Sequence, residues 1–218
     1  MHHFEDPVHG PATTAQGDRL TVGISGPSGS GKTWLVAELH RRLESAAVLQ
    51  QDWFFIDPEF CPPDANFCDP RYLKVDEFVF AVSSLCAGKP VDVPLVDFST
   101  FRQVGTQTVH PAPLTLIEGM TIFRFPEVLS RCQLAYYLAP PMRVLAQRKR
   151  ARDVDERSKS AWVVEQQLTW LRDEYELDLA DLPQTVRVIR VDPSSENLLP
   201  LVPITMDLTT RGVPLNAP

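Results

Sequence analysis

The chain has 218 residues, with 21 basic (Lys and Arg) and 28 acidic (Asp and Glu) side chains, which gives a formal net charge of −7. This length predicts one domain that is large enough to bury a core, and an apolar content of 44% excludes a globally disordered chain. The acidic balance argues against a dedicated nucleic-acid-binding protein, and no apolar run is long enough to span a membrane.

The N-terminal segment, residues 1–18, lacks the apolar stretch of a signal peptide and is predicted to be a disordered leader. The four cysteines show no C-x-x-C spacing, which is typical of free thiols in a reducing compartment and favours a cytoplasmic location. Proline is in excess, with 20 residues against 10 glycines, which predicts rigid connections and an extended or mobile tail over residues 200–218.

The spacing of apolar residues predicts strands that alternate with helices. Strands are expected at 20–25, 46–50, 114–118, 134–138 and 185–191, and helices at 34–43, 75–87, 126–131, 141–152 and 161–175. Residues 53–74 are expected to be irregular, 91–109 extended or a hairpin, and 194–199 the start of a last helix. The central strands lack polar alternation, which predicts a parallel sheet buried on both faces in a three-layer α/β domain over residues 19–199.

The clearest motif lies between the first predicted strand and the first predicted helix. Residues 26–33 match the phosphate-binding pattern G-x-x-x-x-G-K-[ST], in which glycines let backbone N–H groups converge on a phosphate at a helix N-terminus. The predicted phosphate ligands are Gly26, Ser28, Gly29, Ser30, Gly31, Lys32 and Thr33. Lys32 is expected on the β- and γ-phosphates of ATP, and Thr33 on Mg²⁺. The guanine-reading motif N-K-x-D is absent from the sequence, which weighs against a GTPase.

Two further features accompany this loop. Asp52 follows the second predicted strand, at the sheet edge where parallel α/β proteins bind ligands, and a carboxylate there can orient and deprotonate an attacking hydroxyl. Residues 143–157 contain six basic and three acidic side chains, which suits a cluster that neutralises phosphate charge. A capping role for Asp52 and a solvated helix face for residues 143–157 are the open alternatives.

Seven short motifs in one order resemble those of the uridine kinase–phosphoribulokinase family of P-loop kinases, which includes the nicotinamide riboside kinases. After the phosphate loop they are Q-D-x-F-[FY] at 51–55, N-F-x-x-P at 66–70, G-K-x-V-x-V-P at 88–94, D-F-x-[ST] at 97–100, [IF]-E-G at 117–119 and R-D-x-x-E-R at 152–157. The resemblance covers about residues 20–191. It implies a P-loop NTPase fold with a substrate flap at about 53–110 and a lid at about 143–160.

The resemblance also implies roles for single residues. Asp52 resembles the general base for the substrate hydroxyl, Asp69 the acid that holds ribose hydroxyls, and Glu118 the acid that holds Mg²⁺ directly or through water. Arg102 matches a residue near the substrate pocket. Three lid arginines are implied to close over ATP, namely Arg148, Arg152 and Arg157, with Arg152 acting in catalysis and Lys149 behind them.

The predicted substrate pocket departs from the pyrimidine-nucleoside members of this family. Those members have Tyr and His where this chain has Val96 and Phe101, and neither of these can hydrogen-bond a uracil edge. Phe55 and Phe101 can instead stack on a flat ring, although ordinary packing is the open alternative, and Phe98 completes the predicted pocket.

The predicted function is therefore an ATP-dependent small-molecule kinase that transfers the γ-phosphoryl group to a primary hydroxyl, in a ribonucleoside-like substrate the 5′-hydroxyl. Two alternatives stay open: a kinase for another alcohol, such as a sugar phosphate or a pantothenate-like acid, and a non-catalytic ATP-binding regulatory module. The expected partners are ATP and a small-molecule substrate, without nucleic acid or membrane, and no feature of the sequence fixes the oligomeric state.

Overall fold

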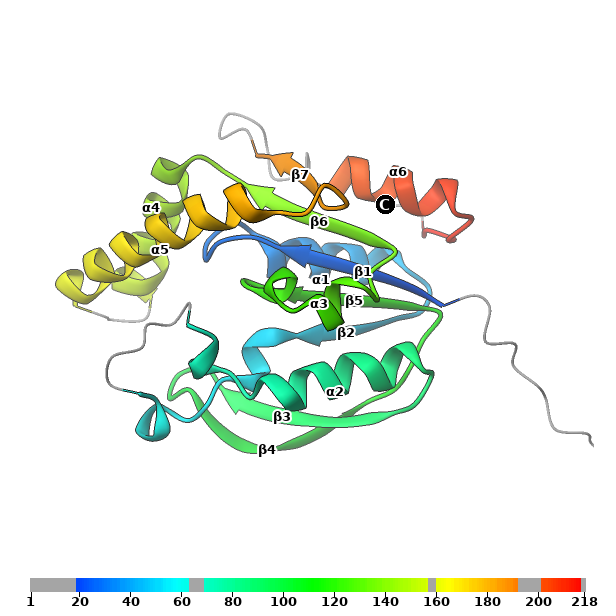
Figure 1. Cartoon of the computed structure of the whole chain (residues 1–218), viewed down its shortest axis with the longest axis horizontal. Helices are drawn as coiled ribbons and strands as arrows, with labels where there is room; N and C mark the ends of the chain where they lie inside the picture. The colour runs from blue at the N-terminus through cyan, green and yellow to red at the C-terminus, as the bar shows by residue number, and fades with distance from the viewer. Residues whose placement is uncertain (1–18, 63–68, 157–159, 192–200, 217–218) are drawn as a thin grey trace, which may run out of the picture.

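A computed structural model of the chain describes residues 19–62, 69–156, 160–191 and 201–216 (Figure 1). At its centre lies a five-stranded sheet in the order β2-β5-β1-β6-β7, in which every neighbouring pair of strands is parallel. The strands are β1 (Leu20–Ser25), β2 (Ala46–Gln50), β5 (Leu114–Gly119), β6 (Leu134–Ala139) and β7 (Arg187–Arg190). The carboxyl ends of all five strands therefore meet at one edge of the sheet.

Helices cover both faces of this sheet (Figure 1). On one face, α1 (Lys32–Arg42) and α6 (Leu201–Thr210) contribute to a single apolar cluster with β1, β5 and β6. On the other face, a second cluster joins the sheet to α2 (Val75–Cys86), α3 (Pro126–Leu129) and the long helix α5 (Ala161–Asp181). The central strand β5 is buried along its whole length. The predicted three-layer α/β fold is confirmed, and α5 extends beyond the predicted end at residue 175.

The segment expected to form a flap contains a hairpin that is separate from the main sheet. Strands β3 (Val91–Asp97) and β4 (Arg102–Val109) pair antiparallel, as the sequence predicted for residues 91–109. The region expected to be irregular holds three 3₁₀ helices, η1 (Gln51–Phe54), η2 (Pro58–Phe60) and η3 (Pro70–Tyr72). The backbone N–H of Lys74 donates to the carbonyl of Phe54 at 2.8 Å, which holds the start of α2 against η1.

The lid expected at residues 143–160 is built from two consecutive elements. Helix α4 (Met142–Arg150) follows β6, and a π-helical turn, η5 (Ala151–Glu156), continues it. Residues 157–159, which include Arg157, lie outside the described residues, as do the predicted leader, the segment 63–68 and the predicted helix start at 194–199. A further 3₁₀ turn, η4 (Ile122–Arg124), follows β5 and leads into α3.

The C-terminal segment differs from the extended or mobile tail that its prolines suggested. Helix α6 occupies residues 201–210 and buries Leu201, Ile204 and Leu208 in the core on the α1 face. Pro203 lies in the first turn of α6, where a backbone N–H has no intrahelical partner to lose, so the proline does not disrupt the helix. The following chain is also fixed, because the N–H of Asn216 donates to the carbonyl of Arg42 at 2.7 Å. Across the described ranges, no helix combines the length and apolar content that crossing a membrane requires.

Candidate active site

The phosphate loop joins β1 to α1 at the carboxyl edge of the sheet. Three of its glycines have positive φ angles, 146° at Gly26, 85° at Gly29 and 96° at Gly31, which side-chain-bearing residues rarely adopt. At Gly26 an added Cβ atom would lie 2.6 Å from the carbonyl oxygen of Leu138. The loop therefore needs glycine both for its backbone conformation and for its close approach to β6.

Polar groups of the loop are arranged for an anion. The ammonium group of Lys32 donates to the carbonyls of Gly26 (2.9 Å) and Pro27 (3.2 Å), so the buried side chain lies along the inside of the loop. The hydroxyl of Ser30 is buried and has no hydrogen-bond partner among the described residues. A buried hydroxyl without a partner is costly, and a phosphate oxygen would satisfy it. This cradle fits the phosphates of ATP.

A hydroxyl and a carboxylate meet beside the loop. Thr33 donates to Oε1 of Glu118 at 2.8 Å, and Glu118 is only 4% exposed at the end of β5. Burial, together with the nearby charge of Asp52, raises the pKa of the Glu118 carboxyl to about 7, against the opposing effects of Lys32 and Thr33. These are hard oxygen donors of the kind Mg²⁺ prefers, and a cation would relieve the cost of the buried carboxylate. Thr33 and Glu118 therefore fit a Mg²⁺ ion.

Asp52 lies on η1, directly after β2, and its side chain is exposed. Its carboxylate is close enough to Glu118 to disfavour the charged form of that residue. The two predicted acids are thus brought together from β2 and β5, with Glu118 buried and Asp52 open to an incoming hydroxyl.

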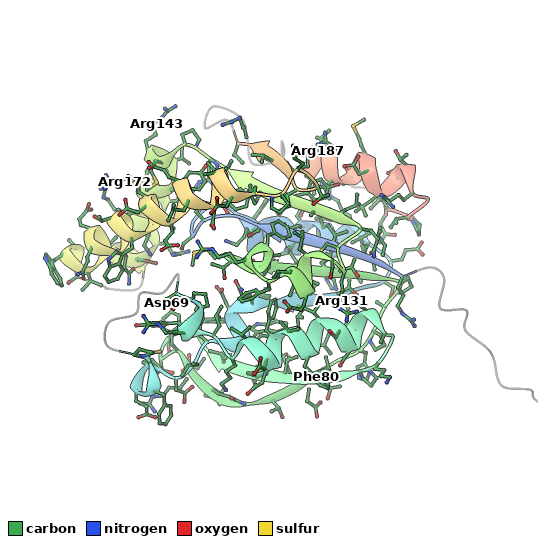
Figure 2. The ribbon with its side chains drawn as sticks, in the orientation of Figure 1. Asp69, Phe80, Arg131, Arg143, Arg172 and Arg187 are labelled. Carbon is green, nitrogen blue, oxygen red and sulfur yellow. The ribbon has the colours of Figure 1, made fainter. Side chains whose placement is uncertain are left out.

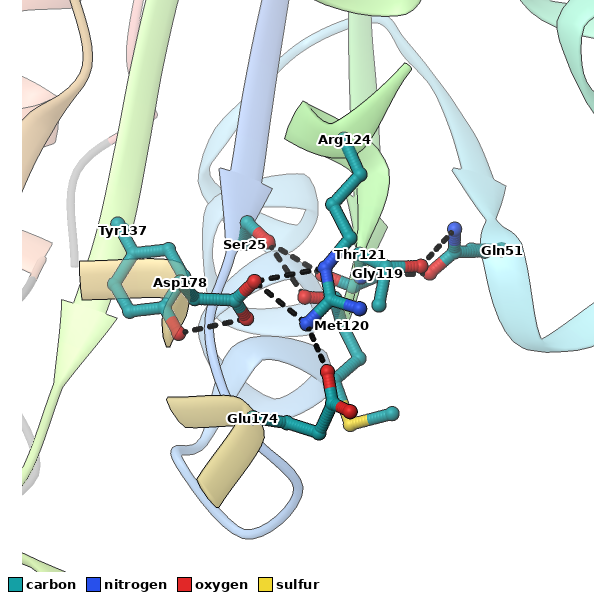
Figure 3. A network of polar contacts seen from close by, with 9 residues as sticks. All are labelled: Ser25, Gln51, Gly119, Met120, Thr121, Arg124, Tyr137, Glu174 and Asp178. Atoms are coloured by element: carbon teal, nitrogen blue, oxygen red, sulfur yellow. Dashed lines mark hydrogen bonds and ion pairs between the residues drawn. The ribbon is translucent and has the colours of Figure 1, made fainter. Parts of the chain in front are cut away.

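The neighbouring Gln51 fixes the position of η1. Its side-chain amide donates to Oγ1 of Thr121 (3.0 Å) and accepts from the backbone N–H of Thr121 (3.1 Å), as Figure 3 shows. At Gly119 an added Cβ atom would lie 2.4 Å from Cβ of Gln51, so only glycine allows this approach. Ser25, which precedes the phosphate loop, donates to the carbonyls of Gly119 (3.1 Å) and Met120 (3.0 Å). The ends of β1, β2 and β5 are therefore held in one network.

An ion cluster extends this network to α5 (Figure 3). Arg124, on η4, contacts Asp178 at 2.7 Å and Glu174 at 2.7 Å, and the hydroxyl of Tyr137 on β6 donates to Asp178 at 3.2 Å. Burial raises the pKa of Asp178, although Arg124 opposes the shift. These residues line part of a pocket of about 400 Å³ between η4 and α5 that reaches Met120. A larger hollow of about 560 Å³ lies at the opposite edge of the sheet, away from the phosphate loop, beside Leu20 and Leu114 at the starts of β1 and β5.

Two of the predicted lid arginines reach the phosphate loop. Nη1 of Arg148 donates to the carbonyl of Gly29 at 3.3 Å, and Nη2 of Arg152 donates to the hydroxyl of Ser28 at 3.2 Å. The structure therefore brings together residues that are more than 100 positions apart in the sequence. Lys149, expected behind the arginines, is 3% exposed and binds the carboxylate of Asp153. Its position is that of an internal counter-ion rather than a phosphate ligand.

The substrate residues predicted on the flap have their described partners within the flap. Asp69 lies on the part of the flap that Figure 2 places below the lid helices, where it binds Arg71 at 2.7 Å. Arg102 binds Glu59 at 3.1 Å across the flap. The rings of Phe98 and Phe101 meet edge to face with centroids 6.3 Å apart, and Phe101 has a φ angle of 55°. Phe55 is half-buried and pairs with Leu73 in an isolated bridge.

One buried polar side chain on α5 was missed by the sequence reasoning. Gln167, on α5, has a buried amide oxygen with no hydrogen-bond partner in the described parts of the chain. On the same helix, Val164, Leu168 and Leu171 pack with Met120 and with Val154 of the lid. A polar residue within an apolar helical pattern was the available signal. The unpaired oxygen makes Gln167 an additional candidate substrate ligand.

Comparison with known proteins adds independent observations. The sequence profile described as the Phosphoribulokinase / Uridine kinase family matches residues 62–180. A uridine kinase of Chloroflexus aurantiacus is 31% identical over 161 residues, which cover 70% of this chain and 77% of that protein. A crystal structure of a candidate fructose transport system kinase from Silicibacter sp. TM1040 aligns with a TM-score of 0.63 at 22% identity, over 80% of this chain and 91% of that chain. A D-glycerate 3-kinase from Cryptococcus neoformans aligns with a TM-score of 0.57 at 12% identity, over 79% and 86%.

Proposed function

The chain belongs to the phosphoribulokinase/uridine kinase family and is a phosphotransferase with an alcohol acceptor, and from that premise we propose a specific reaction. The γ-phosphoryl group of ATP is transferred to a primary hydroxyl of an uncharged, ribonucleoside-like acceptor, in which the 5′-hydroxyl reacts. Family membership sets aside the alternative of a non-catalytic regulatory module.

The observation that carries this proposal is the convergence of four groups at one edge of the sheet. They are the phosphate loop with Lys32, the Thr33–Glu118 pair, the exposed carboxylate of Asp52, and the lid arginines Arg148 and Arg152. Phosphoryl transfer needs positioning and charge stabilisation more than covalent catalysis, and this set supplies both.

Each residue has a defined part in the proposed reaction. Asp52 accepts a hydrogen bond from the acceptor hydroxyl, whose oxygen attacks the γ-phosphorus while the bond to the β,γ-bridging oxygen breaks and ADP leaves. The proton of the hydroxyl passes to Asp52. Lys32, Arg148 and Arg152 neutralise the phosphoryl oxygens as charge moves to the leaving group. Mg²⁺ held by Thr33 and Glu118 would supply further charge neutralisation at the phosphates.

The charge of the flap favours an uncharged acceptor over a sugar phosphate or a pantothenate-like acid. Residues 53–110 contain eight acidic and four basic side chains. Three of the four basic side chains already have partners in the flap: Arg71 binds Asp69, Arg102 binds Glu59, and Lys74 donates to Gln103. The fourth, Lys89, follows the 12-residue helix α2 and so lies about 18 Å from its start near η1. An anionic acceptor would thus meet a surplus of carboxylates.

The proposal is tested by measuring acceptor-dependent ADP formation in a coupled assay. The panel should pair neutral acceptors (ribonucleosides and fructose) with anionic ones (a sugar phosphate, glycerate and pantothenate), and should include the cationic nicotinamide riboside. We expect turnover with a nucleoside-like acceptor and none in purified Lys32→Ala. Turnover confined to anionic acceptors would overturn the proposed substrate class.

A further inference from the structure

A fully buried carboxylate lies in the lid directly beside a predicted catalytic residue. Asp153, in the π-helical turn η5, has no exposed side-chain surface, and its two oxygens bind different cations. Oδ2 accepts from Nζ of Lys149 at 2.7 Å, and Oδ1 accepts from Nε of Arg152 at 2.7 Å. A buried charge is stable only when it is paired and hydrogen-bonded, so this carboxylate has a fixed place and fixed partners.

The contact with Asp153 determines which part of Arg152 faces the phosphate loop. A guanidinium group is planar, with its donors in a rigid arrangement. Asp153 accepts from Nε, which fixes the plane of the guanidinium group, and the adjacent Nη2 of that plane donates to Ser28 on the loop at 3.2 Å. The Arg152 side chain is one-third exposed, so an unconstrained side chain could adopt many other orientations.

Lys149 resolves an electrostatic difficulty in this arrangement. A carboxylate paired with Arg152 alone would cancel the positive charge that the arginine brings to the phosphates. Lys149 is 3% exposed and lies four residues before Asp153, so it supplies a second positive charge on the buried side. The cluster of two cations and one anion keeps a net positive charge, and its Arg152 reaches the loop. π-helical turns are frequent at functional sites, which suits this placement.

We infer that Asp153 is a positioning residue that orients the Arg152 guanidinium toward the transferred phosphoryl group, with Lys149 as its internal counter-ion. This inference rests on the proposed function and adds two residues to it. The lid then depends on a geometry set by buried side chains, and not only on the presence of arginines.

A double-mutant cycle tests this inference. The variants are Asp153→Asn, Arg152→Lys and their combination, and Arg152→Lys is chosen because a lysine has no Nε–H edge for Asp153 to hold. We expect Asp153→Asn alone to lower kcat about 30-fold with little change in the acceptor KM. In the Arg152→Lys background the same change should lower kcat by less than about 3-fold. An equal fold-loss of kcat from Asp153→Asn in the wild-type and the Arg152→Lys backgrounds would overturn the inference.

Controls separate positioning from a loss of folding. Asp153→Asn removes the carboxylate that binds the buried Lys149, so the paired variant Lys149→Met/Asp153→Asn removes both charges and should still show the fall in kcat. Retention of wild-type kcat in this paired variant would also overturn the inference. Glu165→Gln breaks the exposed 2.6 Å pair between Glu165 on α5 and Arg150 of the lid, and it should leave kcat unchanged.

The outcome stays distinguishable from a failure of the proposed function. If the wild-type protein transfers phosphoryl to none of the acceptors in the panel, the proposed reaction is wrong. The same cycle is then read as ATP affinity by calorimetric titration. Coupling between Asp153 and Arg152 in ATP affinity supports the positioning role, and independent effects overturn it.

Discussion

The lid and the flap both contain ion pairs, but among the described residues only the lid holds a pair in which both side chains are buried. In the lid, Asp153 and Lys149 are 0% and 3% exposed, whereas in the flap Arg102 and Glu59 are 52% and 49% exposed. Exposed pairs contribute about 0–1 kcal/mol and rearrange easily, while buried clusters keep one geometry. We interpret this difference as a rigid lid for the constant phosphoryl donor, ATP, and an adaptable flap for the acceptor.

The two regions also differ in the sign of their charge. Residues 143–157 carry six basic and three acidic side chains, and residues 53–110 carry four basic and eight acidic ones. An overall charge of −7 hides this separation. Phosphates are therefore attracted to one side of the site and repelled from the other, which would direct ATP and an uncharged acceptor to different halves.

The largest expected effect is on kcat, at the proposed general base Asp52, which lies beside Glu118. Asp52→Asn keeps the size of the side chain but removes the proton acceptor, so kcat should fall about 1000-fold while ATP affinity stays within about 3-fold of the wild type. Single-turnover kinetics and calorimetric titration measure the two quantities. A kcat near that of the wild type would rule out Asp52 as the general base.

The second effect compares one arginine from each region. Arg152→Ala should lower kcat about 100-fold, because the group that meets the developing phosphoryl charge is lost. Arg102→Ala should lower kcat/KM for a neutral acceptor by less than about 5-fold, because its exposed pair with Glu59 contributes little. Steady-state kinetics of the two variants with the same nucleoside acceptor make the comparison. Equal losses would remove the distinction between rigid lid and adaptable flap.

The third effect is a pH dependence that originates at Glu118. Burial raises the pKa of its carboxyl to about 7 from the ordinary value of 4.5, so between these values the folded chain holds a proton that the unfolded chain has lost. The contribution of Glu118 to the free energy of unfolding is fully present below pH 4.5. It falls by on the order of 3 kcal/mol as the pH rises to about 7.

Glu118→Gln should therefore gain stability relative to the wild type at pH 8 and much less at pH 5. Urea unfolding without Mg²⁺ at both pH values measures the difference. Glu127→Gln, at an exposed carboxylate on α3, is the matched control and should show the same small change at each pH. If the free energies of unfolding of the wild type and Glu118→Gln differed by the same amount at pH 5 and pH 8, the raised pKa of Glu118 would be contradicted.

These predictions rest on features that the sequence revealed to different degrees. The phosphate loop was visible because its glycines and its lysine lie within eight residues at fixed spacing, and the strands were visible because buried parallel strands are apolar throughout. Asp52 and Glu118 could be located because one follows a strand by two residues and the other lies in the last two residues of a strand, so the fold itself places them at the same edge.

Other features depend on partners that are distant in the chain and leave no local pattern. The Gln51–Thr121 contacts join positions 70 residues apart, and the Arg124–Glu174 pair joins positions 50 residues apart. The burial of Lys149 was likewise hidden, because a basic residue in a basic segment predicts exposure. Helix α6 was missed because Pro203 was taken as a break, although a proline in the first helical turn is compatible with the helix.

The smallest expected effect concerns acceptor choice and the exposed pair of the flap. Glu59→Gln removes one of the carboxylates and leaves Arg102 without its 3.1 Å partner, so an anionic acceptor meets less repulsion and a newly available guanidinium. The ratio of kcat/KM for an anionic acceptor to that for a neutral one should rise about 3- to 10-fold. The anionic acceptor is glycerate and the neutral one is glycerol, which has a hydroxymethyl group in place of the carboxylate of glycerate. Asp173→Asn breaks a similarly exposed pair with Arg172 on α5 and is the matched control, with no change expected in the ratio. An unchanged ratio in Glu59→Gln would mean that the acidic flap does not select against anions, and that shape, rather than charge, decides the acceptor.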